Sequence, residues 1–246
     1  MVNIDLSIEQ KHYGQSDQLV LKSVFCSIPS GQFVALVGPS GTGKTTLLNM
    51  IAGLEVGEVN SVMVGGQCVQ ENKGCKVGYI FQQPRLMPWM TVTENLKLIA
   101  PDATLDQVED MLLAVGLEKQ GSRYPRQLSG GMQKRVSIAR AFLTQPDLLL
   151  LDEPFVSLDL PTAAHLRNML ESLWLKHRPT VVFVSHDLDE AICLADRILF
   201  LSSPPGSLLL DHTVELERPR SGAEGSGLVW KQQLLSNYPD LLAGCI

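Results

Sequence analysis

The sequence has 246 residues, with 20 basic and 26 acidic side chains and a formal net charge of −6 at pH 7. Apolar residues make up 45% and charged residues 19%, which is typical of globular proteins and argues against a largely disordered or collagen-like chain. The length fits one large domain, or one domain with a small appendage. Because the balance of charge is acidic, we expect no nucleic acid as a partner.

Apolar runs are short throughout the sequence. The longest uninterrupted runs hold five residues, such as 33–37 and 111–115, whereas a helix needs about 20 apolar residues to span a bilayer. We therefore expect that the chain does not cross a membrane. The N-terminus lacks the charged and apolar regions of a secretory signal, so the chain is expected to stay where it is made. The five cysteines include no C-x-x-C pair and indicate reduced thiols.

The first thirty residues have the alternating pattern of half-buried strands. Apolar and polar residues alternate over 2–8, and the pattern returns over 19–28, before turn residues at 29–31. We expect antiparallel strands in this part of the chain.

Buried strands and helices then follow one another along the chain. Residues 33–37 form a continuous apolar run, which a glycine-rich turn and a helical pattern up to Leu54 follow. Further apolar runs predict strands at 77–81, 148–151, 181–184 and 198–201. Strands of this kind, several of them separated by helices, predict an α/β fold with a mostly parallel sheet.

Residues 91–145 contain amphipathic stretches and no strong strand pattern, so we expect a mostly helical insertion between two strands of the sheet. Helix starts are indicated by two pairs with capping-box spacing and by a proline suited to a first turn, at Thr104 with Gln107, Asp187 with Glu190, and Pro161.

The C-terminal part differs from the rest in composition. Residues 217–227 are rich in glycine, serine and charged side chains, which predicts a flexible linker. A short helix is expected over 228–238.

A glycine-rich motif follows the strand at 33–37. Its glycines let the backbone wrap around an anion, and the N-terminus of the next helix adds partial positive charge. Lys44 can reach the β and γ phosphates of a nucleotide, and Thr45 offers a hydroxyl to Mg²⁺. The motif matches G-x-x-x-x-G-K-[ST] and reads Gly38, Pro39, Ser40, Gly41, Thr42, Gly43, Lys44, Thr45, Thr46.

Two acidic residues end the apolar strand at 148–151. Asp152 is the expected Mg²⁺ carboxylate, and Glu153 is the candidate base that polarises the attacking water. Taken alone, the pair followed by Pro154 favours an ordinary turn at a strand end. His186 comes after the strand at 181–184, at the sheet edge where a ligand belongs.

Together with these residues, a further segment resembles the signature of the ATP-binding subunits of ATP-binding cassette (ABC) transporters. Residues 128–133 read Leu-Ser-Gly-Gly-Met-Gln and are similar to the family's LSGGQ. Met132 replaces the usual glutamine, as in the branch that imports nitrate, sulfonates and taurine. The resemblance covers about residues 1–215.

The resemblance implies roles for residues that composition alone does not single out. Tyr13 matches the aromatic residue that stacks on adenine, and Gln82 matches the loop residue that contacts the metal and the γ phosphate. Ser157, Leu158 and Asp159 match the D-loop, and His186 the switch histidine. Ser129, Gly130 and Gly131 would contact the γ phosphate of ATP bound by a second copy of the chain.

The fold implied by the resemblance is a P-loop NTPase core with a mostly parallel sheet. An N-terminal antiparallel β subdomain and a helical insertion subdomain at about 85–145 complete an ATP-binding domain over 1–215, and residues 216–246 form a linker and tail. The implied function is an ATPase that uses ATP and Mg²⁺ to power an importer of small solutes. Its partners would be a second copy of itself, a membrane permease reached through residues 82–89 and, indirectly, a solute-binding protein. It would lie peripherally on the cytoplasmic face of the inner membrane.

Other functions remain open on the sequence. A soluble ABC-type ATPase of DNA repair or translation usually carries a long coiled coil or two cassettes, and this chain has one motif at 38–46 and no heptads. A P-loop kinase or GTPase leaves residues 128–133 unexplained. An ABC exporter or lipid-transport ATPase is a further alternative.

Overall fold

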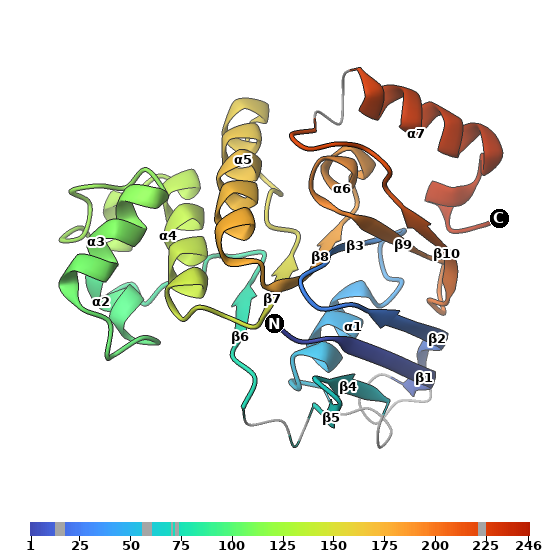
Figure 1. Cartoon of the computed structure of the whole chain (residues 1–246), viewed down its shortest axis with the longest axis horizontal. Helices are drawn as coiled ribbons and strands as arrows, with labels where there is room; N and C mark the ends of the chain where they lie inside the picture. Colours follow the sequence, from blue (N-terminus) through green and yellow to red (C-terminus); the bar gives the residue numbers. More distant parts are fainter. Residues whose placement is uncertain (13–17, 56–60, 70, 72–73, 221–224) are drawn as a thin grey trace. The chain divides into compact units, whose positions relative to one another are not determined.

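The computed structural model describes residues 1–12, 18–55, 61–69, 71, 74–220 and 225–246 (Figure 1). The chain divides into two units. Unit 1 comprises Met1–Cys75 and Pro179–Ile246, and unit 2 comprises Lys76–Arg178. Among the described residues, no helix is both long enough and apolar enough to cross a membrane.

Unit 1 begins with an antiparallel sheet in the order β2-β1-β4-β5. Residues of β1 pair antiparallel with β2 from Ile4 opposite Ile28 to His12 opposite Leu19. The prediction of antiparallel strands near the N-terminus is confirmed. The two short strands β4 and β5 were not predicted. The four strands are β1 (Ile4–His12), β2 (Leu19–Ile28), β4 (Val62–Val64) and β5 (Gln67–Cys68).

A second group of strands in unit 1 is mainly parallel. β3 lies between β8 and β9 and is parallel to both, whereas β10 pairs antiparallel with β9. All five residues of β3 are buried, as expected for a strand covered on both faces. The bounds are β3 (Phe33–Val37), β8 (Thr180–Ser185), β9 (Arg197–Leu201) and β10 (Leu208–Thr213).

Two helices follow these strands, and two more elements end the chain. α1 (Lys44–Ile51) follows β3, and α6 (Leu188–Leu194) follows β8. α7 (Ser226–Asn237) confirms the predicted C-terminal helix, and the 3-10 helix η2 (Leu241–Ala243) comes after it.

The described part of the linker predicted to be flexible is held by hydrogen bonds to residues just before β9 and just after β10. Arg218 donates to a carboxylate oxygen of Asp196 at 2.7 Å, and Arg220 donates to the carbonyls of Val214 and Ala195. Residues 221–224 lie outside the described residues, and the division at residue 215 stays a prediction.

Unit 2 contains the predicted helical insertion. β6 (Val77–Ile80) pairs in parallel with β7 (Leu148–Asp152), and α5 (Leu160–His177) follows β7. Every residue from 91 to 145 is described, and none forms a strand. The helical elements between β6 and β7 are α2 (Val92–Lys97), α3 (Leu105–Ala114), η1 (Pro125–Gln127) and α4 (Gly130–Leu143).

The helix starts test the capping predictions. Thr104 and Gln107 form the predicted capping box at α3, and Pro161 lies in the first turn of α5. The box predicted for Asp187 and Glu190 is wrong. Asp187 caps α6 by accepting from the amide of Asp189, whereas the carboxylate of Glu190 accepts instead from the hydroxyl of Ser185 at 2.6 Å.

Candidate functional site

The glycine-rich loop at 38–43 connects β3 to α1 in unit 1, as the phosphate-loop prediction requires. Gly43 has φ +86°, and a Cβ there would lie 2.8 Å from side-chain atoms of both Val20 and Leu21. At Gly38 a Cβ would lie 2.9 Å from the carbonyl oxygen of Leu201. Glycine is therefore required at both positions, by backbone conformation and by close approach at Gly43, and by close approach alone at Gly38.

Lys44 is 6% exposed at the start of α1. Its Nζ donates hydrogen bonds to the carbonyl oxygens of Gly38 at 2.8 Å and Pro39 at 2.6 Å, so the ammonium lies inside the loop. Thr42 is fully buried, and its hydroxyl oxygen has no hydrogen-bond partner among the described residues. Ser40, Gly41 and Thr45 are exposed, and Pro39, Gly43 and Thr46 are half-buried.

His186 belongs to the same unit and the same sheet edge as the loop. β3 and β8 are parallel, and Val37 pairs with Ser185. The loop after β3 and His186 after β8 therefore leave the sheet side by side, at the carboxyl ends of parallel strands. His186 is exposed. Tyr13, predicted to stack on adenine, lies outside the described residues.

Unit 2 brings Gln82 and Glu153 together. β6 and β7 are parallel with Ile80 opposite Leu151, so Asp152 and Glu153 emerge beside the start of the Gln82 loop. The amide Nε2 of Gln82 donates to Oε2 of Glu153 at 3.3 Å. Glu153 has φ +44°, a conformation that non-glycine residues seldom adopt and that is often found at functional sites.

Donor chemistry decides whether a Mg²⁺ ion suits the predicted ligands. Thr45, Gln82 and Asp152 offer a hydroxyl, an amide oxygen and a carboxylate, all hard oxygen donors. The hydrogen bond from Gln82 to Glu153 uses the amide nitrogen and not the amide oxygen. The predicted set holds one carboxylate, and proteins usually bind Mg²⁺ with one or two carboxylates together with substrate phosphates. Among the described residues, no group of three or more His, Cys, Asp and Glu side chains could hold a metal.

The predicted signature residues lie at the N-terminus of α4 in unit 2. Ser129 is the N-cap, and its hydroxyl accepts from the amide of Met132 at 3.3 Å. Ser129 and Gly130 are exposed, and a Cβ on Gly130 would meet nothing within 4 Å. Gly131 is tighter, because a Cβ there would lie 2.9 Å from Cγ2 of Thr162. The exposed end of a 14-residue helix with small residues suits an incoming phosphate.

A hollow of about 330 Å³ joins these parts of unit 2. Gln82 and Gly130 line it, and so do Ser157 and Leu158 of the predicted D-loop. Three segments that are distant in the sequence therefore meet around one opening.

Sequence reasoning missed two residues that hold the Gln82 loop. Lys134 on α4 is 4% exposed, and its Nζ donates to the carbonyls of Phe81 and Gln82. Arg140 donates to the carbonyls of Arg85 at 3.0 Å and Pro84 at 3.1 Å. Burial lowers the pKa of Lys134, an effect that the charge of Asp152 opposes, and burial also lowers the pKa of Arg140.

The spacing of buried residues along α4 indicates that Lys134 is buried. Lys134 lies one turn before Ser137 and Ile138, which are buried on the same face of α4. Lysine is seldom buried, so a lysine at this spacing was not predicted to lie in the interior.

Sequence comparisons show the family of the chain. The model of the ABC transporter family matches residues 21–156. The chain belongs to this family. It is 39% identical over 243 residues to the aliphatic sulfonates import ATP-binding protein SsuB of Bacillus subtilis (strain 168), covering 96% of this chain and 94% of that protein. It is 43% identical to the protein of the same name from Pectobacterium atrosepticum, covering 85% of this chain and 77% of that protein.

Solved structures of ABC cassettes are similar in fold. The ATP-binding cassette MJ0796, in a dimeric post-hydrolysis state bound to ADP and Pi, matches with a TM-score of 0.74 and 29% identity. The dimeric structure of MJ0796, described as a bacterial ABC transporter cassette, matches with a TM-score of 0.73 and 29% identity. Each match covers 88% of this chain and 100% of that chain. The predicted P-loop NTPase fold, with its antiparallel β part and helical insertion, is confirmed.

Proposed function

We propose that the chain is the ATP-hydrolysing subunit of an ABC importer for a small solute of the nitrate, sulfonate or taurine kind. The observation that carries this proposal is the 39% identity, over nearly the whole chain, to a protein named as an import ATP-binding protein for aliphatic sulfonates. The geometry supports the same function, because each unit gathers the residues expected for one part of an ATPase site.

Residues 38–46 bind the triphosphate of ATP in this proposal. Backbone amides of the loop and the N-terminus of α1 face the phosphate oxygens. Lys44 exchanges its contacts with the carbonyls of Gly38 and Pro39 for the β and γ phosphates. Tyr13 stacks on the adenine, as the resemblance implies.

Thr45, Gln82 and Asp152 would hold Mg²⁺. When bound, the ion supplies positive charge that neutralises the phosphate oxygens during transfer.

Glu153 is the base for hydrolysis. Its carboxylate accepts the proton of the attacking water, and the amide of Gln82 fixes the carboxylate through the 3.3 Å hydrogen bond. His186, at the sheet edge of unit 1 that carries the phosphate loop, contacts the γ phosphate. These two side chains with Lys44 form the catalytic set.

The active form is a dimer in which each ATP lies between two copies of the chain. Ser129, Gly130 and Gly131 of one copy contact the γ phosphate held by the loop of the other. Their exposure at the N-terminus of α4 supports this role, as do the dimeric structures of the similar cassette. Hydrolysis removes the charge that both copies contact, and the dimer opens.

The proposed docking site for a short helix of the permease comprises residues 82–89 and a groove of about 710 Å³ in unit 2. The two are connected through Arg140, which lines the groove and donates to the carbonyls of Pro84 and Arg85.

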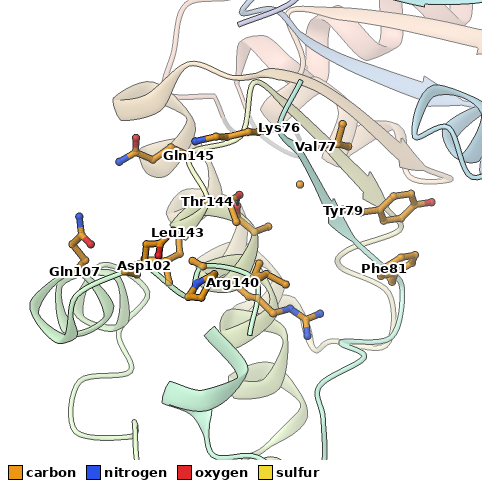
Figure 2. Close-up of a pocket in the computed structure, with 16 residues that line it drawn as sticks. Lys76, Val77, Tyr79, Phe81, Asp102, Gln107, Arg140, Leu143, Thr144 and Gln145 are labelled. Atoms are coloured by element: carbon orange, nitrogen blue, oxygen red, sulfur yellow. Dashed lines mark hydrogen bonds between the residues drawn. The ribbon is translucent and has the colours of Figure 1, made fainter. Parts of the chain in front are cut away.

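Figure 2 shows Tyr79 and Phe81 on one side of the groove and Gln107 and Asp102 on the other. The rings of Tyr79 and Phe81 stack with their centroids 4.1 Å apart, and Ile99 in the lining is 44% exposed. The apolar lining suits the apolar face of a helix.

Continuity with the ATPase site favours this occupant over others. Phe81 lines the groove and immediately precedes Gln82, so a movement of Gln82 is passed to the groove wall. A tyrosine hydroxyl is neutral at pH 7, and burial raises the pKa of Tyr79 further. We place the subunit peripherally on the cytoplasmic face of the inner membrane, with a solute-binding protein acting on the far side of the permease.

Trp89 tests the coupling between ATP hydrolysis and the permease. Its side chain is 70% exposed at the end of the loop that begins at Gln82. We expect Trp89→Ala to reduce solute uptake by the reconstituted transporter at least tenfold, while the ATPase activity of the subunit alone stays within twofold of wild type. Uptake into proteoliposomes, measured beside phosphate release, checks this. Leu113→Ala, a change at an apolar side chain of α3 that is 62% exposed in the same unit and does not line the groove, is the matched control. Full uptake with Trp89→Ala would remove this loop from the docking surface.

A further inference from the structure

The C-terminal segment, residues 225–246, has no part in the ATP chemistry proposed above, yet it is packed firmly on unit 1. Leu241 is fully buried and Leu234 is 3% exposed. Lys231 on α7 bonds both carboxylate oxygens of Asp189, at 2.8 and 2.9 Å. Asp189 lies on α6, three residues after His186. The segment is therefore anchored next to the predicted switch histidine.

The end of the segment is fixed a second time, at the turn that connects β9 to β10. The amide of Ser203 in this turn donates to the carbonyl oxygen of Gly244 at 3.1 Å. Gly244 has φ +82°, and a Cβ there would lie 2.3 Å from the nitrogen of Ser203. The same Cβ would lie 3.0 Å from Cγ of Pro39, a residue of the phosphate loop. Only glycine allows this approach.

The other side of the same turn lies against the phosphate loop. A Cβ on Gly206 would come within 2.0 Å of the carbonyl oxygen of Thr42, so the two backbones are in direct contact. Gly206 is itself fixed, because its amide donates to the carbonyl of Val20 at 2.8 Å and its carbonyl accepts from Lys22 at 2.9 Å. The turn at 202–206 is thus enclosed between the phosphate loop and the C-terminal segment.

These contacts reach the residue that binds phosphate. Pro39, which Gly244 approaches, offers its carbonyl to the ammonium of Lys44 at 2.6 Å. Thr42, which Gly206 approaches, is fully buried in the loop. Both contacts restrict the conformations open to the loop, and a loop held in its binding conformation binds its ligand more tightly than one that must first be ordered.

We propose that the C-terminal segment is a positioning element of the ATP site, acting through Gly244 and the turn at 202–206 on the phosphate loop. It sets the affinity for ATP through Pro39 and Thr42 of the phosphate loop. It leaves the chemical step unchanged, because at saturating ATP the bound phosphates themselves order the loop. The inference rests on the proposed assignment of residues 38–46 to the triphosphate.

Two glycines of the segment provide a matched pair for the test. Gly225 has φ +61° and ψ −131°, a conformation that alanine adopts even less readily than the left-handed conformation of Gly244, but a Cβ there would meet nothing within 4 Å. In the full-length chain we expect Gly244→Ala to raise the Kd for ATP at least tenfold, with kcat at saturating ATP within twofold of wild type. Gly225→Ala is expected to leave both quantities within twofold. Equal Kd values for the two variants would overturn the proposal.

A second variant, with a milder change, tests the proposal if Gly244→Ala does not fold. Lys231→Met removes the ion pair with Asp189 and introduces no clash, and we expect it to raise the Kd for ATP at least threefold, while a wild-type Kd would count against the proposal. Thermal unfolding of each variant is recorded beside the Kd. Lys44→Ala distinguishes a failure of the proposed phosphate loop from a failure of the proposed role of the C-terminal segment. If it still binds ATP, the loop assignment itself fails; if it does not and Gly244→Ala matches Gly225→Ala, only the present inference fails.

Discussion

Replacing Lys44 by alanine is expected to weaken ATP binding at least 100-fold and to abolish turnover. The ammonium is the one side-chain cation in the motif at 38–46, and it is held inside the loop by the carbonyls of Gly38 and Pro39. Without it the phosphate charge is met by backbone amides alone, in a site where one charge-assisted contact is worth about 1.5–3 kcal/mol and a phosphate makes several. Equilibrium binding of ATP and release of phosphate measure the two effects.

The control for Lys44→Ala is Lys22→Ala, which removes an exposed lysine of β2 in the same unit. It should bind and hydrolyse ATP like the wild type. Turnover by Lys44→Ala at the wild-type rate would show that residues 38–46 do not bind the phosphates.

Replacing Glu153 by glutamine is expected to lower the rate of hydrolysis by about 10²- to 10⁴-fold, the usual contribution of a general base. The new side chain has the same size, and its amide oxygen can still accept from Nε2 of Gln82. ATP binding should therefore persist, and the dimer should accumulate because its γ phosphate is not removed. Size-exclusion chromatography with and without ATP, combined with single-turnover hydrolysis, measures both outcomes.

Glu109→Gln is the matched control, because Glu109 is exposed on α3 and lies in the same unit. It should hydrolyse ATP normally and form no stable dimer. A Glu153→Gln variant that stays monomeric with ATP and turns over at the wild-type rate would exclude Glu153 as the base.

The buried strands could be predicted from the sequence to within one residue at most ends. β3, β7, β8 and β9 are runs of apolar residues buried almost throughout, and such runs have few other places in a globular fold. β10 was missed because it contains Asp211 and His212 and none of its residues is buried. Its place depends on pairing with β9, which is a tertiary contact.

The candidate site was predictable where chain order and strand direction decide it. Parallel pairing puts the phosphate loop beside His186, and Gln82 beside Glu153, in two separate units. The hydrogen bond from the buried ammonium of Lys134 to the carbonyl of Gln82 could not be predicted, because the two residues are 52 apart in the sequence. The approach of Gly244 to Pro39 is of the same kind, since nothing in the local sequence marks a partner about 200 residues away.

The capping prediction at α6 failed for a related reason. The spacing of Asp187 and Glu190 fits a capping box, but Ser185 at the end of β8 competes for the carboxylate of Glu190. The spacing of two residues in a helix shows which hydrogen bond is possible, but a competing donor on the neighbouring strand determines which one forms.

Affinity purification from membranes tests most directly whether this ATPase works on a membrane permease. The tagged full-length chain is recovered from detergent-solubilised membranes, and the co-purifying proteins are identified by mass spectrometry. We predict recovery of a protein with several membrane spans, in amounts that fall when Trp89 is replaced by alanine. Recovery of ribosomes or DNA-repair factors, or of no integral membrane protein at all, would contradict the account.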